Sequence, residues 1–478
     1  MAAATTPAPL YVQIAEGIIT QIENGTLCVG EKAPSLRRLS KQKRVSISTA
    51  LQAYLWLESH GHLEARPKSG FFVRRPFSSL IPEPRVDVPR TAPHVPGHKE
   101  ILSTLVASAR DPDCIPFAAG CWSPELYPNR PMNIIVRRIV NRKPLHSAFY
   151  EFPPGLESLR RQLARRSPDL GCSLTADDFI ITGGTLEAVN LSLRAVAKPG
   201  DVIAVESPTY FGVLGSIAAL GMKTVEIPTH PQDGMDLDQL ESAIRKHRVK
   251  ACVVMSNCHN PLGYVLSDQS KKDLADLGAR RNIAIIEDDV YGDVAFGASR
   301  PRTVKSFDRK ELVLLCSSFS KTLPPGYRVG WIAPGRFHAE VERLRFLSTV
   351  TASTLSQMVI AEFLDSGGYD RHLRRLRTEL AGRVENVRQA IARYFPEGTR
   401  ISRPAGGLLL WVEMPPKTDA LKLYQKALAE RIAILPGKIF SPANRFRHHI
   451  RINCGQTWGE KHERALVRLG RLCETAVV

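Results

Sequence analysis

The chain has 478 residues, of which 43% are hydrophobic and 23% are charged, an ordinary composition for a globular protein of two or three domains. No apolar run approaches the ~18 residues that cross a bilayer, and the N-terminus lacks the basic and apolar segments of a secretory signal, so we expect a cytoplasmic protein that does not enter the membrane. The nine cysteines form no CxxC pair, which argues against a zinc site or a disulfide framework, and the formal net charge of +18 favours anionic partners.

The first 75 residues contain three predicted helices. Leu10, Ile14, Ile18 and Ile22 recur every four residues and predict a first helix that ends at Asn24-Gly25. Ser35 is a plausible N-cap for a short second helix through Leu36 and Leu39, and either Ser46 or Ser48 can cap a third. For the third helix we expect Leu51, Tyr54 and Leu55 on the buried face.

Two short strands follow, at residues 63–66 and 71–74, joined by Pro67-Lys68-Ser69-Gly70. Short helices followed by a basic hairpin describe an α+β winged helix-turn-helix domain, which we place at residues 8–75. This part of the chain is also the more basic one, because residues 1–76 hold ten Lys and Arg against five Glu. Double-stranded DNA is therefore the expected partner of this domain.

A proline-rich segment separates this domain from the rest of the chain. Six prolines fall between residues 76 and 96, without a helical or alternating pattern, so we expect a semi-rigid linker at residues 76–110. A second domain is predicted at 111–478, with a smaller C-terminal α+β subdomain from about residue 340.

Within the second domain, short apolar runs at 179–182, 202–205, 251–255, 283–286 and 312–315 alternate with helical patterns. Such runs predict an α/β fold with a mostly parallel sheet covered on both faces. Because ligands of these sheets bind at the carboxyl ends of the strands, the residues after each run are the candidates for a site.

Each of the five runs is followed by residues with a distinct chemistry. The first leads into Gly183, Gly184 and Thr185 at the start of a predicted helix, where free N–H groups suit a phosphate. The later runs lead, in order, to the aromatic Tyr210, the amide Asn260, the acidic stretch Glu287-Asp288-Asp289 with Tyr291, and SSFSKTLPPGYRVGW with its lone amine Lys321.

One ligand accounts for all five ends, namely a phosphorylated, electron-poor pyridine that bears an aldehyde. Lys321 would form a Schiff base with the aldehyde, and a carboxylate would keep the pyridine nitrogen protonated. Tyr210 would stack on the ring, Asn260 and Tyr291 would bond its phenolic oxygen, and hydroxyls with Arg328 would hold the phosphate. The acidic stretch alone could also be a magnesium site or a solvated loop end.

The motifs SSFSKTLPPGYRVGW, HNPLG, EDDVY, VESPTY and ITGGT resemble the pyridoxal-phosphate site of class I, fold type I aminotransferases. The N-terminal segments KAPSLRRLSKQKRVSISTALQAYLWLESHGHL and KSGFFV resemble a GntR-type winged helix. Together they resemble the MocR-type subfamily of GntR regulators, in which these two domains are fused, and the resemblance spans nearly the whole chain.

The resemblance implies pyridoxal 5'-phosphate as cofactor, with Lys321, Asp288 and Tyr210 in the chemistry and Arg451, in HHIRINCG, on the α-carboxylate of a substrate or effector. Gly120 would lie on the substrate side, and Tyr150 would reach the phosphate of a neighbouring subunit, which implies a homodimer. The spacing of three residues to Tyr291 favours Asp288 over Asp289 at the pyridine. The cofactor-binding residues implied in this way are Lys321, Gly183, Gly184, Thr185, Tyr210, Asn260, Asp288, Tyr291, Ser318, Ser320, Arg328 and Tyr150.

For the DNA-binding domain we expect phosphate contacts from basic residues and base contacts from the third helix. The candidates are Arg37, Arg38 and Lys43 around the second helix, Ser46, Ser48, Thr49 and Gln52 on the third, and Lys68 and Ser69 at the tip of the hairpin. Two positions depart from the family pattern: Ile47 stands where GntR helices often carry an arginine, and Leu186 where many MocR members have glutamine near the phosphate.

Two functions remain open from the sequence. One is a transcription regulator that senses an amino acid or an amine through Schiff-base exchange at Lys321. The other is a working aminotransferase that carries a DNA-binding domain, because Lys321, Asp288, Tyr210, Asn260 and Arg451 suffice for the half-reaction.

Overall fold

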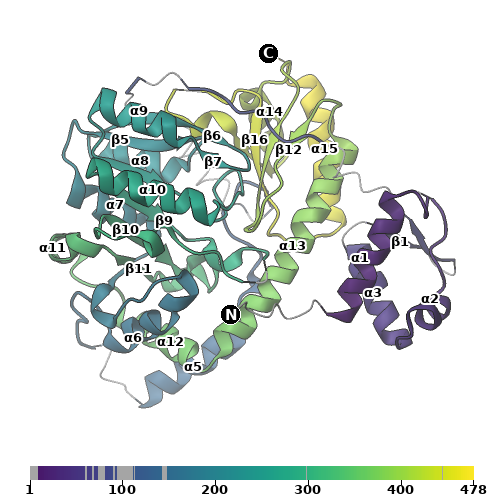
Figure 1. Ribbon diagram of the computed structural model, residues 1–478, viewed down its shortest axis with the longest axis horizontal. Coiled ribbons are helices and arrows are strands. Elements are labelled where there is room, and N and C mark those ends of the chain that lie inside the picture. Colours follow the sequence, from purple (N-terminus) through teal and green to yellow (C-terminus); the bar gives the residue numbers. More distant parts are fainter. Residues whose placement is uncertain are drawn as a thin grey trace.

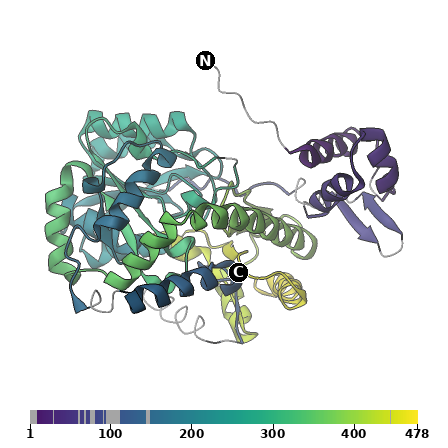
Figure 2. The ribbon, with the colours of Figure 1, turned by 90° about the horizontal axis from the view of Figure 1, so that it is seen from below.

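The N-terminal part of the protein is a small helical unit with a two-stranded hairpin, which stands apart from the body of the molecule in both views of the computed structural model (Figure 1; Figure 2). It contains α1 (Leu10–Glu23), α2 (Leu36–Lys43), α3 (Ile47–Ser59) and the antiparallel strands β1 (Leu63–Arg66) and β2 (Gly70–Val73). The structure describes residues 9–28, 30–59, 62–66, 69–73, 81–89, 92–93, 111, 113–142, 148–297, 299–443 and 445–477.

The predicted caps of this unit are present. The Ser35 hydroxyl accepts a hydrogen bond from the Arg38 N–H (3.3 Å), and the Ser46 hydroxyl accepts one from the Thr49 N–H (3.1 Å), so Ser46 rather than Ser48 begins α3. The buried core of the unit includes Ile14, Ile18, Leu39, Tyr54 and Leu57.

The expected buried face of α3 was wrong for two residues. Leu51 and Leu55 are 37% and 49% exposed, and Ala50 and Ala53 are buried beside Tyr54 instead. Because α3 packs closely on α1 and α2, the small alanines fit at this interface. The leucines therefore lie on the outer side of the helix. Together with Ile47, which is 53% exposed, they leave an apolar stripe on the outer side of α3.

The large subdomain is built on an eight-stranded, mostly parallel sheet in the order β4-β11-β10-β9-β8-β5-β6-β7, with β11 and β7 antiparallel to their neighbours. Successive residues of one strand face opposite sides. Ile203 and Val205 pack with α7 (Thr185–Val196) and α8 (Phe211–Ala219), whereas Ala204 packs with α9 (Leu237–His247) and α10 (Asp268–Arg281). The strands are β4 (Ile180–Thr182), β5 (Val202–Ser207), β6 (Lys223–His230), β7 (Gly234–Met235), β8 (Ala251–Val254), β9 (Ala284–Asp288), β10 (Val313–Ser318) and β11 (Gly330–Ala333).

Helices cover both faces of this sheet, as the sequence predicts for parallel strands. The helices around it are α5 (Asn129–Arg142), α6 (Glu157–Arg166), α7 (Thr185–Val196), α8 (Phe211–Ala219), α9 (Leu237–His247), α10 (Asp268–Arg281), α11 (His338–Thr349) and α12 (Thr354–Asp365). Because α11 packs on α7, and α12 on α5 and α6, residues 340–365 belong to the large subdomain and not, as expected, to the small one.

The small subdomain begins with the long helix α13 (Gly368–Tyr394) and contains a second sheet in the order β12-β13-β16-β15. Its apolar core joins α13, α14 and α15 to that sheet. The remaining elements are β3 (Ile115–Pro116), β12 (Arg400–Ile401), β13 (Leu409–Glu413), α14 (Ala420–Ala429), β14 (Ile432–Ala433), β15 (Leu435–Pro436), β16 (His449–Asn453) and α15 (Glu460–Thr475), with β3 pairing β14.

Part of the predicted linker is fastened to this small subdomain. Pro84 and Pro89 are buried, and Ile81 packs against the apolar core of the subdomain. We call residues 81–89 the strap. Its polar contacts are Ile401 N–H to the Pro82 carbonyl (3.0 Å), Arg85 N–H to the Glu413 carboxylate (2.7 Å) and Arg445 to the Asp87 carboxylate (2.8 Å).

Of the helices that the structure describes, none combines the length and the apolar character that a membrane span requires.

Candidate functional site

The carboxyl ends of the central strands open into a cavity of about 290 Å³. Eleven of the residues predicted from the sequence line it, although they come from segments more than 300 residues apart. These residues are Gly120, Thr185, Tyr210, Asn260, Asp288, Tyr291, Ser318, Ser320, Lys321, Arg328 and Arg451; Ala118, Leu186, Phe211, Met255 and Val290 complete the lining.

Lys321 lies just after β10, with its amine inside the cavity. The Nζ atom donates a hydrogen bond to the Gly120 carbonyl and lies 5.4 Å from the centre of the Tyr291 ring. Burial lowers the pKa of the Lys321 amine, so a larger share of it is neutral and nucleophilic than in water.

Asp288, the last residue of β9, supplies the carboxylate of the cavity. Its Oδ1 accepts a hydrogen bond from the Val290 N–H (3.2 Å), and burial raises its pKa to about 7. The neighbouring Asp289 is turned away from the cavity, where it accepts hydrogen bonds from Asn257 (2.8 Å) and Arg300. The alternation of side chains along the strand therefore places Asp288, and not Asp289, at the cavity.

The raised pKa makes the stability of the cofactor-free protein depend on pH. The folded protein keeps a proton on Asp288 up to about pH 7, whereas the unfolded chain releases it near pH 4. The free energy of unfolding should therefore fall between about pH 4 and pH 7, by about 4 kcal/mol for a three-unit difference, and level off above. Asp288→Asn should remove this part of the slope in denaturant titrations.

Glu287 provides the internal comparison for that experiment. Burial raises its pKa to about 7 as well, and the Asp288→Asn substitution does not change Glu287. The Asp288→Asn protein should thus retain part of the pH slope, and an unchanged slope would show that Asp288 is already ionised in the folded protein.

One end of the cavity is suited to a phosphate. Gly184 has a φ of 133°, a conformation open to glycine, and a Cβ there would meet the Arg328 guanidinium at 2.6 Å. Arg328 Nη1 donates to the Ser320 hydroxyl (3.2 Å), and Arg328 itself is held at a φ of 52°. The buried Thr185 hydroxyl has no hydrogen-bond partner among the described residues, as expected where a ligand oxygen belongs.

Gly183 plays a different part from the one expected. Its N–H donates to the Glu187 carboxylate within α7, and it is absent from the residues that line the cavity. Thr185, Ser318, Ser320 and Arg328 line the cavity at the end that is suited to a phosphate, and Gly184 lies beside the Arg328 guanidinium.

Arg451, in the middle of β16, is a buried guanidinium without a carboxylate partner among the described residues. It is 2% exposed, and its Nη atoms donate to the Asn260 side chain (3.2 Å) and the Ala118 carbonyl (2.6 Å), while Nε has no partner. Burial lowers the pKa of Arg451 to about 10. A buried cation that lines a cavity without a described counter-ion is suited to an anion such as a carboxylate.

A chain of buried polar groups behind the cavity connects Lys321 to α13. The Tyr369 hydroxyl donates to Asp293 (2.7 Å) and is hydrogen-bonded to the hydroxyl of Thr322 (2.9 Å), the residue next to Lys321, and Arg300 joins Asp293 to Asp289. These residues were not predicted as part of the site, because the contacts join positions up to 76 apart and no local motif marks them.

Tyr150 does not line this cavity. It is 70% exposed and lies 5.7 Å, ring to ring, from Phe152, which is 53% exposed, and Phe149 beside it is 72% exposed. Within one chain it therefore contributes nothing to the cofactor site.

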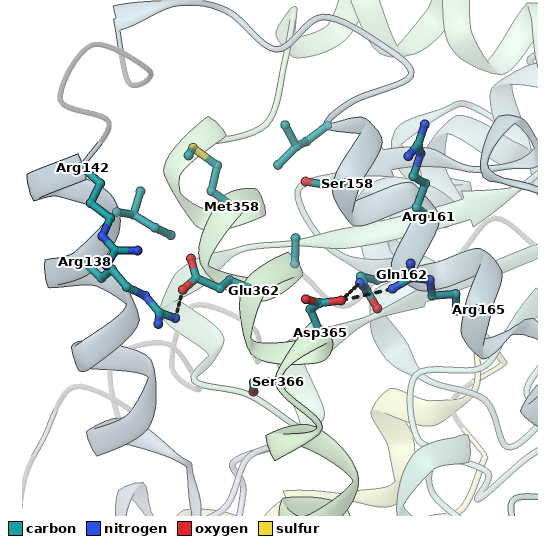
Figure 3. Close-up of a pocket in the computed structure, with 13 residues that line it drawn as sticks. Arg138, Arg142, Ser158, Arg161, Gln162, Arg165, Met358, Glu362, Asp365 and Ser366 are labelled. Atoms are coloured by element: carbon teal, nitrogen blue, oxygen red, sulfur yellow. Dashed lines mark hydrogen bonds and ion pairs between the residues drawn. The ribbon is translucent and has the colours of Figure 1, made fainter.

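A second groove, with a volume of about 680 Å³, lies elsewhere, between α5, α6 and α12 (Figure 3). Its charges are largely paired: Arg138 contacts Glu362, and Asp365 accepts from Arg165 (3.1 Å) and Gln162 (2.8 Å). None of the residues predicted for the cofactor lines it. In the described parts of the chain, no group of His, Cys, Asp or Glu is arranged to hold a metal ion, which leaves the magnesium alternative for Glu287–Asp289 without support.

In the N-terminal unit, five basic side chains on and after α2 are exposed, and no described carboxylate forms an ion pair with them; they are Arg37, Arg38, Lys41, Lys43 and Arg44. Gln52 and Ser69 are exposed as expected. The hydroxyls of Ser48 and Thr49 bond the Ser46 hydroxyl at the start of α3 (2.7 and 2.8 Å). Lys68 lies outside the described residues.

Two families match this sequence. Residues 10–73 match the bacterial regulatory proteins of the gntR family, and residues 145–469 match aminotransferase class I and II. Over 464 residues the chain is 38% identical to the uncharacterized HTH-type transcriptional regulator YdcR of Escherichia coli, covering 97% of this chain and 99% of that protein.

Solved aminotransferases share the fold of the body. The multiple substrate aminotransferase of Thermococcus profundus is 25% identical, with a TM-score of 0.73 over 80% of this chain and 96% of that one. The α-aminoadipate aminotransferase of Thermus thermophilus, complexed with N-(5'-phosphopyridoxyl)-L-leucine, is 24% identical, with a TM-score of 0.71 over 79% of this chain and 98% of that one.

Proposed function

The chain belongs to the aminotransferase class I and II family and carries a gntR-family domain, the architecture of MocR-type regulators, and from this premise we propose that it senses an amino acid or an amine by Schiff-base exchange at Lys321. The sensed molecule would change the affinity of the N-terminal domain for a double-stranded operator. The observation that carries the proposal is the combination of two features in one chain. The helix-turn-helix has exposed basic residues without described carboxylate partners, and the cavity contains the Lys321 amine and the Arg451 guanidinium, which has no described counter-ion.

The cofactor of the aminotransferase-like domain is pyridoxal 5'-phosphate. It supplies an aldehyde that links to an amine and a ring that withdraws electrons. The cavity fits it, because Gly184, Thr185, Ser320 and Arg328 form an anion cradle at one end and the Asp288 carboxyl lies within the same lining. The protein's own groups would then select the effector. The amine of the effector would replace Lys321 in the covalent link to the cofactor, and its carboxylate would bind Arg451.

The strap offers a route from the cavity to the DNA-binding domain. It is bonded to β12, to Glu413 in β13 and to Arg445, and β13 pairs directly with β16, which carries Arg451. A shift of the small subdomain around a bound carboxylate would therefore move the chain segment that leads back to the helix-turn-helix.

A homodimer completes the proposal. Tyr150 and its exposed aromatic neighbours Phe149 and Phe152 form an apolar surface of the kind that interfaces cover. In a dimer Tyr150 would serve the phosphate of the partner's cavity, and two helix-turn-helix units would face paired half-sites.

The test uses the full-length protein with its cofactor bound. Selection from random duplexes at physiological salt should yield a defined operator, and titration with amino acids and amines should change the visible absorbance and the operator affinity over the same concentration range. Absence of any sequence preference would overturn the regulatory proposal.

A second candidate is an aminotransferase, since Lys321, Asp288, Tyr210, Asn260 and Arg451 all line one cavity. Steady-state transamination with a panel of amino donors and keto acids would decide this alternative. Turnover without any effect of donors on DNA binding would favour it over the regulator.

The exposed basic residues predict how DNA binding depends on salt. Replacing Arg37 and Arg38 with Ala should weaken binding to all sequences and reduce the slope of log K against log salt concentration by about 2, because each arginine neutralises one phosphate. Binding isotherms between low and physiological salt measure this slope. Arg309→Ala, an exposed arginine of the large subdomain, should leave it unchanged.

A further inference from the structure

The outer side of α3 carries an apolar stripe that the proposed function has not used. Ile47, Leu51 and Leu55 follow one another at intervals of four residues and are 53%, 37% and 49% exposed. Elsewhere on α3 the domain buries Tyr54 and Leu57 completely. We therefore expect the exposed isoleucine at the first position of α3 to contact a binding partner.

The surroundings of Ile47 indicate which partner this is. The side chain lies at the start of α3, next to Ser46 and Ser48, and the preceding helix and its C-cap present Arg37, Arg38, Lys41, Lys43 and Arg44 without carboxylate partners among the described residues. Such an uncompensated basic rim suits a polyanion, whereas an apolar protein surface would leave these charges unsatisfied. In helix-turn-helix domains, the N-terminal residues of the second helix of the motif contact base edges in the major groove.

The hydroxyls at the start of α3 are hydrogen-bonded to one another. The Ser46 hydroxyl accepts the Thr49 N–H and also bonds the hydroxyls of Ser48 and Thr49. Ile47 itself offers neither a donor nor an acceptor, so it cannot satisfy the polar edges of guanine, adenine or cytosine. The major groove exposes a single apolar group, the 5-methyl of thymine.

We infer that Ile47 is a specificity-determining residue that contacts a thymine methyl group in each half-site of the operator. This inference rests on the proposed function, since it assumes that α3 enters the major groove. An arginine at position 47 would select guanine, whereas Ile47 selects thymine. A base with a polar edge against Ile47 would lose its bound water without gaining a hydrogen bond.

The experiment uses the full-length protein with its cofactor and the operator obtained by selection. Each thymine is replaced in turn by deoxyuridine, which removes the methyl group and keeps every hydrogen-bonding atom, and affinity is measured by fluorescence anisotropy. For the wild-type protein, one thymine in each half-site should lose about fourfold in affinity when its methyl is removed, the value of burying one such group.

Variants of Ile47 test whether this residue makes the contact with the thymine methyl group. Ile47→Ala should bind thymine and deoxyuridine operators equally well, and Ile47→Arg should shift the selected base at this position to guanine. Leu55→Ala is the matched control: it removes an equally exposed apolar side chain two turns further along α3 and should keep the fourfold preference for thymine.

The outcomes separate this inference from the proposed function. If a specific operator is selected but none of its thymines loses affinity on replacement by deoxyuridine, the inference is overturned and the proposed regulatory function stands. This part of the experiment needs no variant protein. A penalty that persists in Ile47→Ala also overturns it, as does a change of oligomeric state in Ile47→Ala without a change in thymine preference, which would make the stripe a protein contact. Failure to select any operator contradicts both.

Discussion

Lys321→Ala should abolish the covalent link between protein and cofactor and, with it, every response of DNA binding to effector amines. The reason is its position, because among the described residues that line the cavity Lys321 alone carries an amine, which donates to the Gly120 carbonyl and lies beside the Tyr291 ring. Burial lowers the pKa of this amine, which makes it competent as a nucleophile near neutral pH. The measurements are the visible absorbance of dialysed protein and the mass of the chain after borohydride reduction.

Lys271 supplies a matched control for this experiment. It is also a buried lysine whose pKa burial lowers, but it lies on α10 and does not line the cavity. Lys271→Met should retain the absorbance, the mass increase on reduction and the effector response. If the Lys321→Ala chain still gained the mass of the cofactor after reduction, a different amine would be the attachment point and the proposed sensing chemistry would fall.

The parts of the site that the sequence predicted well are those that depend on strand ends. Each apolar run predicts a buried strand, parallel strands end at one edge, and the polar residues that follow therefore meet. The strand ends therefore predict that Asn260, Asp288 and Lys321 meet, and all three line the cavity. The choice of Asp288 over Asp289 depended only on the spacing to Tyr291, and the alternation of side chains along β9 now gives the physical reason for it.

Other features could not be predicted because they depend on tertiary packing. Leu51 and Leu55 have the apolar character of core residues, yet the close approach of α3 to its neighbours leaves room for alanines and turns the leucines outward. Similarly, the prolines of the linker predict an extended segment but not the surface that holds it. The strap and the polar chain from Asp289 to Thr322 join positions that are far apart along the sequence, so no local pattern marks them.

Arg451→Gln should selectively remove the recognition of a carboxylate. In the structure Arg451 is buried, donates to the Asn260 side chain and to the Ala118 and Ala119 carbonyls, and has no described counter-ion. A charged hydrogen bond to a ligand carboxylate contributes about 2 kcal/mol, so an amino acid effector should lose roughly thirtyfold in affinity. The corresponding amine without a carboxyl group should bind the variant as well as it binds the wild-type protein.

The comparison between an amino acid and its decarboxylated amine is the decisive measurement, because it cancels any general damage to the cavity. Arg160→Gln is a control for the loss of a buried arginine, since Arg160 is also buried and donates to carbonyls of the chain and to Asp177 but does not line the cavity. Equal losses for both ligands in Arg451→Gln would mean that Arg451 only shapes the cavity through Asn260. A loss confined to the amino acid would instead identify Arg451 as the point where the effector engages β16, and hence the sheet to which the strap is fastened.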